Sequence, residues 1–295
     1  MSYVLSANTP PPIVIHLDSR TGEQLQTGLT TNFLYTLKEP VLVPDHMNLL
    51  LSLHTATIPY SFYNVGDHNN TFKFEISGVS RTDLNLDLDK GNYSANGILN
   101  LLKTHLQTEA SITTAIITYS RETLKFSFSY VGSASSVKIL DTSTARELIG
   151  VKVGFPIVFS KYPAVGFLSP NAIDLNDSIH GLYIRQNLAT KGTLDTEQGT
   201  FSNILARIPI TTNAGGIIFF TPSSNSHETM ISVPMIQTIG IRLTDDKHRS
   251  IDLNGLHFQL SLKIAYIHKE TLKPLQPRRY KEDIKIDDKK KSKKK

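Results

Sequence analysis

The stretch LHFQLSLKIAYI, residues 256–267, alternates apolar and polar side chains along almost its whole length. One face would carry the side chains at even positions, which are Leu256, Phe258, Leu260, Leu262, Ile264 and Tyr266. The other would carry His257, Gln259, Ser261 and Lys263. A period of two residues is that of a β-strand, so the pattern predicts a long strand covered on one side only.

Similar short runs, rich in β-branched and aromatic residues and separated by Pro, Gly, Asn and Asp, recur along the chain. They predict strands at residues 13–17, 32–37, 47–58, 71–76, 84–88, 115–120, 124–130, 137–140, 179–186, 202–210, 216–221, 229–233 and 237–243. We interpret Gly215-Gly216 as a hairpin turn. The helix-per-strand rhythm of a parallel α/β protein does not occur, and the spacing favours a sandwich.

Two helices are predicted among these strands. Apolar residues at a spacing of three and four follow Ser94 up to Leu106, and Ser94 is placed to cap the first turn. A second, short helix is expected at residues 144–149, because Thr144 and Glu147 have capping-box spacing and Gly150 follows.

Composition argues against most kinds of active site. The chain has no cysteine, which excludes disulfides, thiolate nucleophiles and cysteine-ligated zinc. His46 and His54 would lie ~26 Å apart along one strand, too far for joint metal binding. We found no nucleophile elbow and no phosphate loop. Asp245-Asp246 is interpreted as a solvated turn. The sequence therefore predicts no enzyme, no cofactor and no metal site.

The basic charge is concentrated at the end of the chain. Residues 278–295 hold ten Lys or Arg and four acidic residues, a net charge of +6, so the remaining residues carry −1 of the total +5. The run that we single out as a candidate contact for an anionic partner is Lys289, Lys290, Lys291, Lys293, Lys294 and Lys295. Three readings stay open: contact with packaged DNA or an anionic inner membrane, docking onto an acidic groove of a partner, and solubility. Residues 1–20 show no basic or apolar export signal, and no apolar run is long enough to span a membrane, so we expect a cytosolic origin.

Several phrases resemble the penton and minor capsid proteins of nucleocytoplasmic large DNA viruses, virophages and polinton-like elements. They are SLHTATIPYSFYNV at residues 52–65, GNYS at 91–94, IGIRLTDD at 239–246 and IDLNG at 251–255. Their order covers about four-fifths of the chain. Each also has a plain structural reading, since Pro59 can end a strand and residues 252–255 can form a turn.

The resemblance implies a mainly β fold, an antiparallel jelly-roll sandwich with an inserted α+β subdomain. The expected divisions are an extended N-terminal arm at 1–20, a first part of the jelly roll at 21–58, the insertion at 59–175, a second part at 176–272 and a basic tail at 273–295. Two tandem domains that meet near residue 170 are the alternative. A contact between residues 47–58 and the strands after Ser178 would separate the two.

The function implied is that of a virion structural protein, a penton or minor capsid subunit that assembles into an icosahedral capsid in the host cytoplasm. Expected partners are copies of the chain, with a pentamer favoured, the major capsid protein, other minor capsid proteins, and DNA or an inner membrane at the tail. The alternative is a carbohydrate- or receptor-binding β-sandwich module at the vertex, with loops at residues 64–70 and 221–227. A hydrolase with a dispersed site is a third reading, which no motif favours.

Overall fold

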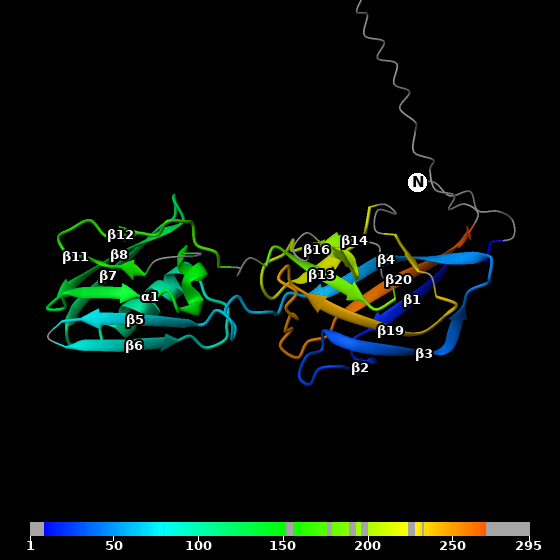
Figure 1. The fold of residues 1–295 in the computed structure, drawn as a ribbon, viewed down its shortest axis with the longest axis horizontal. Coiled ribbons are helices and arrows are strands. Elements are labelled where there is room, and N and C mark those ends of the chain that lie inside the picture. Colours follow the sequence, from blue (N-terminus) through cyan, green and yellow to red (C-terminus); the bar gives the residue numbers. More distant parts are fainter. Residues whose placement is uncertain are drawn as a thin grey trace, which may run out of the picture.

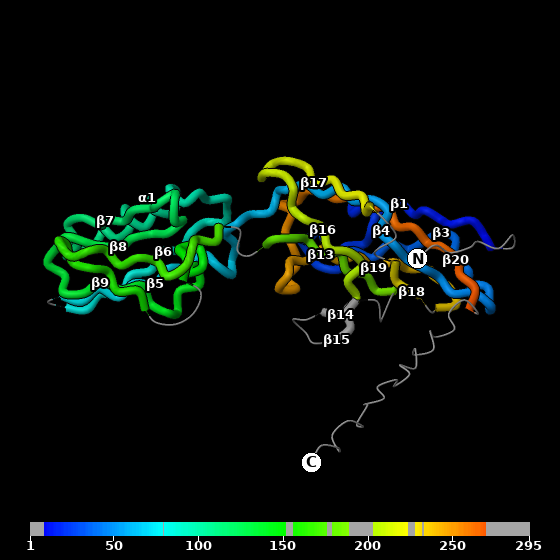
Figure 2. Tube along the Cα trace, turned by 90° about the horizontal axis from the view of Figure 1, so that it is seen from above, coloured from blue at the N-terminus to red at the C-terminus, as the bar shows by residue number. Residues whose placement is uncertain are grey.

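The computed structural model describes residues 9–78, 80–151, 156–175, 179–188, 193–195, 200–223, 228–231 and 233–269. Within these ranges the chain forms twenty strands, one α-helix and one 3₁₀-helix, so the protein is mainly β. Every strand pair is antiparallel except β11 with β8. The strands form two lobes that lie end to end along the long axis (Figure 1), and the view turned by 90° shows the same separation (Figure 2).

The larger lobe, here called the sandwich, contains two sheets. The β4 sheet has the order β1-β20-β4-β17, with β18 also paired to β4. The β3 sheet has the order β16-β13-β19-β3-β2. The strands of the β4 sheet are β1 (Ile13–Asp18), β20 (Gln259–His268), β4 (Met47–Pro59), β17 (Ile217–Phe220) and β18 (Thr229–Ile231). Those of the β3 sheet are β16 (Ile204–Pro209), β13 (Gly181–Gln186), β19 (Met235–Thr244), β3 (Asn32–Leu42) and β2 (Glu23–Gln24). A short hairpin, β14 (Thr193–Asp195) with β15 (Thr200–Ser202), accompanies them.

One hydrophobic core lies between these two sheets. It draws on β3, β4, β13, β16, β19 and β20, and its bulkiest fully buried side chains include Phe33 and Phe258, whose rings meet edge to face at 5.7 Å. Burial of apolar side chains on both inner faces is the main force that holds two such sheets together. The predicted apolar face is buried from Phe258 to Tyr266, whereas Leu256 precedes β20 and is exposed. The other face is not fully open as expected, because Ser261 and Ile267 are buried as well.

Strand β4 joins parts of the chain that are far apart in sequence. It pairs with β17, β18 and β20, all of which follow residue 178. This is the contact that separates a split sandwich from two tandem domains.

Residues 13–18 correct the expected arm at residues 1–20. They form β1, which pairs with β20 from Ile13 opposite Ile264 to Asp18 opposite Gln259. Leu17 is buried in the sandwich core, and Ile13 and Ile15 pack against it. The alternation of these three side chains therefore places the segment in the sheet, where burial outweighs the freedom of an arm.

The smaller lobe, here called the α+β lobe, has its own core and two sheets. Its strands are β5 (Thr71–Ser77), β6 (Arg81–Asp87), β7 (Ile112–Ser120), β8 (Lys125–Gly132), β9 (Ser136–Ile139), β10 (Ile157–Val158), β11 (Ser160–Lys161) and β12 (Phe167–Leu168). The orders are β10-β9-β5-β6 and β11-β8-β12, with β7 paired to β8. Its core contains Phe72, Phe74, Phe126, Phe128 and Tyr130 and shares no residue with that of the sandwich.

Helix α1 (Ala95–Leu106) packs against β7, as the apolar spacing predicted. The Gly97 N–H donates to Ser94 Oγ over 3.1 Å, which caps the helix as expected, and Ile98, Leu102 and Leu106 are buried. None of the described helices has the length and apolarity needed to cross a membrane.

The second helix corrects the expected capping box. Residues Thr144–Ile149 form a 3₁₀-helix, η1, with Ser143 at the N-cap and no side-chain cap bond. The hydroxyls face β5 instead: Thr71 N–H donates to Thr144 Oγ1 over 3.0 Å, and Lys73 N–H to Ser143 Oγ over 2.9 Å. Gly150 does end the helix, with a φ of 80°.

Candidate functional site: the junction of the two lobes

The chain passes from the sandwich to the α+β lobe over two residues. Phe62 is buried in the sandwich core and Val65 in the core of the other lobe, so Tyr63 and Asn64 alone make the crossing. The return path leaves the α+β lobe at Leu175 and enters the sandwich core at Ile179. A crossing this short leaves little slack between the two cores.

On the sandwich side, the first crossing is held by hydrogen bonds to the turn at residues 252–255. Ser61 Oγ donates to the carbonyl of Leu253 over 2.7 Å, and the Asn254 side-chain amide donates to the carbonyl of Ser61. The turn itself is closed by Asn254 N–H donating to Asp252 Oδ1 over 2.8 Å, with Asn254 at a φ of 52°. Asparagine is among the few residues that adopt this conformation readily.

The α+β lobe holds the other side through three residues that we call the latch: Asn64, Asn92 and Tyr93. Asn64 Oδ1 accepts from Tyr93 N–H and Asn64 Nδ2 donates to the carbonyl of Tyr93, both over 2.8 Å. Asn92 Oδ1 accepts from Asn64 N–H over 3.0 Å. Val65 and Gly91 exchange two backbone hydrogen bonds of 3.1 Å. The phrases SFYNV, GNYS and DLNG thus meet at this junction.

Ion pairs surround the crossing. Lys90 pairs with Asp67 over 2.8 Å, and this hydrogen bond raises the pKa of Lys90. Lys247 of the sandwich approaches Glu147 of the α+β lobe over 3.5 Å, a contact that bridges the two lobes. Exposed pairs of this kind contribute little stability on their own.

Asp245 corrects the expected solvated turn at Asp245-Asp246. Its side chain is 1% exposed and pairs with Arg249 Nε over 2.6 Å. Arg249 N–H also donates to Asp245 Oδ1 over 2.8 Å. A buried carboxylate that accepts two such bonds stabilises the turn at residues 245–249, which begins directly after β19 and lies close to the crossing.

A cleft with a volume of about 540 Å³ lies at the junction, lined by both lobes and by the residues of the crossing. A second hollow of about 390 Å³ adjoins it, and His68 and Arg249 line both. Both hollows are lined by acidic and basic side chains. Within the described ranges, no three His, Asp or Glu side chains form a group that could hold a metal ion.

Two Ser–His contacts, one between β1 and β20 and one just beyond the ends of these strands, were missed by sequence reasoning. His16 Nδ1 lies 2.8 Å from Ser261 Oγ, which also accepts from Thr55 Oγ1 over 3.0 Å. Ser19 Oγ lies 3.1 Å from His257 Nδ1 and accepts from Phe258 N–H over 3.0 Å. The strand register brings together residues more than 230 positions apart, and no local motif announces it.

Neither serine is presented to a substrate. Ser261 is 6% exposed and Ser19 is 1% exposed, and each hydroxyl already contacts two partners. A nucleophile needs an accessible oxygen beside its base. We interpret both contacts as fastenings of β1 to β20.

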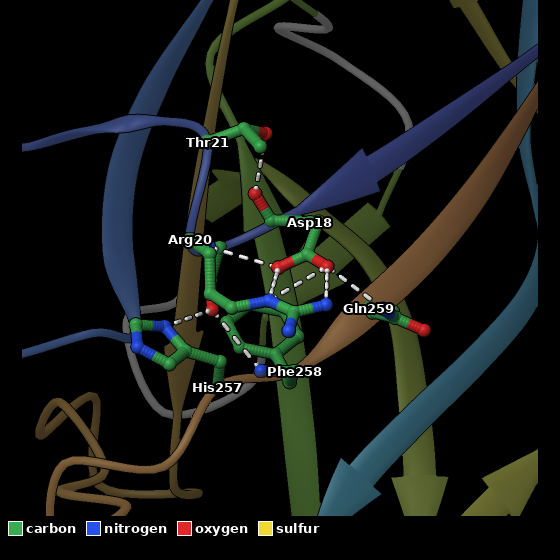
Figure 3. Close-up of polar contacts among 7 residues, drawn as sticks. Asp18, Arg20, Thr21, His257, Phe258 and Gln259 are labelled. Carbon is green, nitrogen blue, oxygen red and sulfur yellow. Dashed lines mark hydrogen bonds and ion pairs between the residues drawn. The ribbon is translucent and has the colours of Figure 1, made fainter.

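Asp18 makes a third fastening at the same place (Figure 3). Arg20 Nη2 reaches Asp18 Oδ2 over 2.5 Å, and Gln259 Nε2 donates to the same oxygen over 2.7 Å. The hydrogen bond from Arg20 holds the pKa of Asp18 well below its usual range. The end of β1 is thereby tied to the start of β20.

The other expected site residues are dispersed. His54 is exposed and lies at a bulge in β4. Ser261 of β20 pairs with Thr55 and Leu262 pairs with Leu53, so His54 has no partner in the β20 register. His46 lies beside His268 instead, with ring centroids 5.5 Å apart. The tail residues Lys289, Lys290, Lys291, Lys293, Lys294 and Lys295 lie outside the described residues.

Of the two loops considered for sugar binding, the one at residues 64–70 lies wholly within the described residues. In this loop, Asn69 Nδ2 donates to the carbonyl of Asn64 and Asn69 Oδ1 accepts from Gly66 N–H. The Asn69 side chain therefore forms its hydrogen bonds within the loop. In the loop at 221–227, residues 224–227 lie outside the described ranges.

Comparison with solved structures identifies a protein with a similar fold. No protein-family profile and no curated protein matches the sequence. The crystal structure of the mavirus penton protein is similar with a TM-score of 0.51 and 12% identity, covering 87% of this chain and 100% of that one. A chain of the Sputnik virophage structure has a TM-score of 0.44 and 14% identity, covering 89% and 99%. At such identities, the first likeness shows a shared fold.

Proposed function

We propose that this chain is a virion structural protein, a penton or minor capsid subunit that assembles into and stabilises an icosahedral capsid. The observation that carries the proposal is the fold shared with the mavirus penton protein over the whole of that protein. A fold alone does not determine function. The order of the capsid-like phrases in the sequence supports the proposal. So does the meeting of three of them, SFYNV, GNYS and DLNG, at the junction.

We further propose that the sandwich is a jelly roll. The chain passes repeatedly between the sheets: β1, β4, β17, β18 and β20 lie in one, and β3, β13, β16 and β19 in the other, with β13 and β16 paired in the same sheet. In the β4 sheet the first strand lies beside the last, and in the β3 sheet β3 lies beside β19. This interleaving of early and late strands is what two Greek keys would produce.

The proposed division keeps the jelly roll at residues 21–58 and 176–272, together with β1, and the insertion at 59–175, between β4 and β13. The first boundary moves to residue 63, because Phe62 is still buried in the sandwich core. The α+β lobe lies at one end of the sandwich (Figure 1). The insertion would then project from the capsid body as a separate block, and the basic tail at 273–295 would leave from the opposite end, where β20 ends beside Met47.

In this account the protein works by burying surface between copies and neighbours. The latch and the two-residue crossing would hold the α+β lobe at one angle, so that contacts made by either lobe are transmitted to the other. Permanent interfaces of this kind bury on the order of 2,000 Å² or more. We therefore propose a structural role and not an enzymatic one.

The proposed partners are further copies of the chain in a pentamer, the major capsid protein and other minor capsid proteins. We place the protein in the virion, assembled in the host cytoplasm. The lysine tail would contact packaged DNA or an anionic inner membrane, with an affinity that falls as salt rises.

Electron cryomicroscopy of the particles that contain the chain tests the proposal. We expect density at the vertices, or between major capsid subunits, that accommodates the sandwich with the α+β lobe at one end. Purified particles that lack the chain, or density that fits neither lobe, would refute the capsid role.

A further inference from the structure

One edge of the β4 sheet is apolar and lacks charge. Strand β17 forms this edge, and Ile217 and Phe219 are 65% and 67% exposed on it. Among the described residues, no strand pairs with its outer side. Between Arg207 and His227 the sequence contains no acidic or basic residue. Soluble proteins normally protect sheet edges with charges, and an unprotected apolar edge is a site of association.

The opposite edge of the same sheet has the same character. Strand β1 pairs only with β20 in the described residues, and Val14 is 42% exposed on it. Pro11 and Pro12 precede the strand and are also exposed. No Asp, Glu, Lys, Arg or His occurs at residues 1–15. Beyond Ile15 the strand carries His16 and ends at Asp18, so the uncharged part of this edge is its first half.

We propose that the β17 edge of one copy packs against the β1 edge of a second copy, with Phe219 and Ile217 facing Val14 and the proline segment. This inference rests on the proposed function, which supplies the second copy, and it names the surfaces that meet. Interface cores are depleted of charge and enriched in aromatic residues, which matches the uncharged part of both edges and Phe219 on β17.

A second copy is the occupant that the geometry favours. Because the two edges differ and lie on opposite sides of one sheet, their contact is head-to-tail, and such a contact repeats from copy to copy until a ring closes. Ring closure covers every uncharged edge at once. A partner of another kind on β17 would leave the β1 edge of each copy open.

Cross-linking tests the contact directly, because the chain has no cysteine of its own. Val14→Cys and Phe219→Cys are prepared as separate full-length variants, mixed, and treated with a short bismaleimide. The matched control replaces Val14→Cys by Thr118→Cys, an exposed strand position on the α+β lobe. Mass photometry of the untreated proteins measures the oligomer.

We expect cross-linked dimers from the Val14→Cys and Phe219→Cys mixture at least tenfold above those from either variant alone or from the control mixture. Phe219→Lys should abolish the oligomer while the circular dichroism spectrum stays that of the wild type. Cross-linking of Phe219→Cys with itself would overturn the head-to-tail contact. An oligomer without the expected cross-link would overturn this interface and leave the capsid role standing, whereas a strict monomer would count against the capsid role itself.

Discussion

Removing the Asn64 side-chain amide should destabilise the protein more than its half-buried position suggests. Asn64→Ala deletes two hydrogen bonds of 2.8 Å and leaves the half-buried N–H and carbonyl of Tyr93 without these partners. A net loss of about 1 kcal/mol per bond, with part of the desolvation penalty for the orphaned groups, gives a decrease of about 2–3 kcal/mol in the free energy of unfolding.

Urea denaturation followed by circular dichroism measures this loss. Asn64→Asp keeps the acceptor for Tyr93 N–H and removes the donor, so about half of the loss is expected. Asn85→Ala, at an exposed position of β6, should change the free energy of unfolding by less than about 0.5 kcal/mol. If Asn64→Ala were as stable as Asn85→Ala, the latch would contribute nothing to the junction.

Three further variants test other parts of the fold. Leu262→Ala, at a fully buried position of β20, should cost about 2–5 kcal/mol in a thermal or urea melt, and a loss below 1 kcal/mol would contradict the proposed core. Gly150→Ala should lower stability by more than Gly28→Ala, because both have φ near 80° but only at Gly150 would a Cβ lie 2.2 Å from a backbone carbonyl. Arg20 lowers the pKa of Asp18 in the folded protein, so the paired carboxylate stabilises the fold at any pH above its unfolded pKa of about 4. This contribution is lost as the pH falls further. The gap in free energy of unfolding between wild type and Asp18→Asn should therefore be full at pH 7 and shrink below about pH 4. A gap that stayed constant down to pH 2 would refute the assignment.

Local periodicity predicted the elements well and their partners poorly. Helix α1 and the long alternating strand could be read because spacing of three and four, or of two, is visible in a dozen residues. Strand β17 pairs with β4 over a separation of about 160 residues, which no local pattern reveals. The same limit explains Gly215-Gly216: the turn connects β16 to β17, which lie in different sheets, so it is not a hairpin turn.

Polar residues were the least predictable part of the junction. Asn64, Asn92 and Asp252 look like ordinary turn residues, and only their arrangement in space makes them a joint. Asp245 was expected in water because acidic pairs usually are, yet Arg249 allows it to be buried. In the sequence the order of these phrases supported only the family resemblance, and their meeting at the crossing appears only in the structure.

Native mass spectrometry of the full-length chain tests most directly the claim that the protein acts by packing against copies of itself. The account predicts a closed oligomer, with a pentamer expected, that persists on dilution and is lost in Phe219→Lys. A single species at the mass of one chain, unchanged up to high protein concentration, would contradict it.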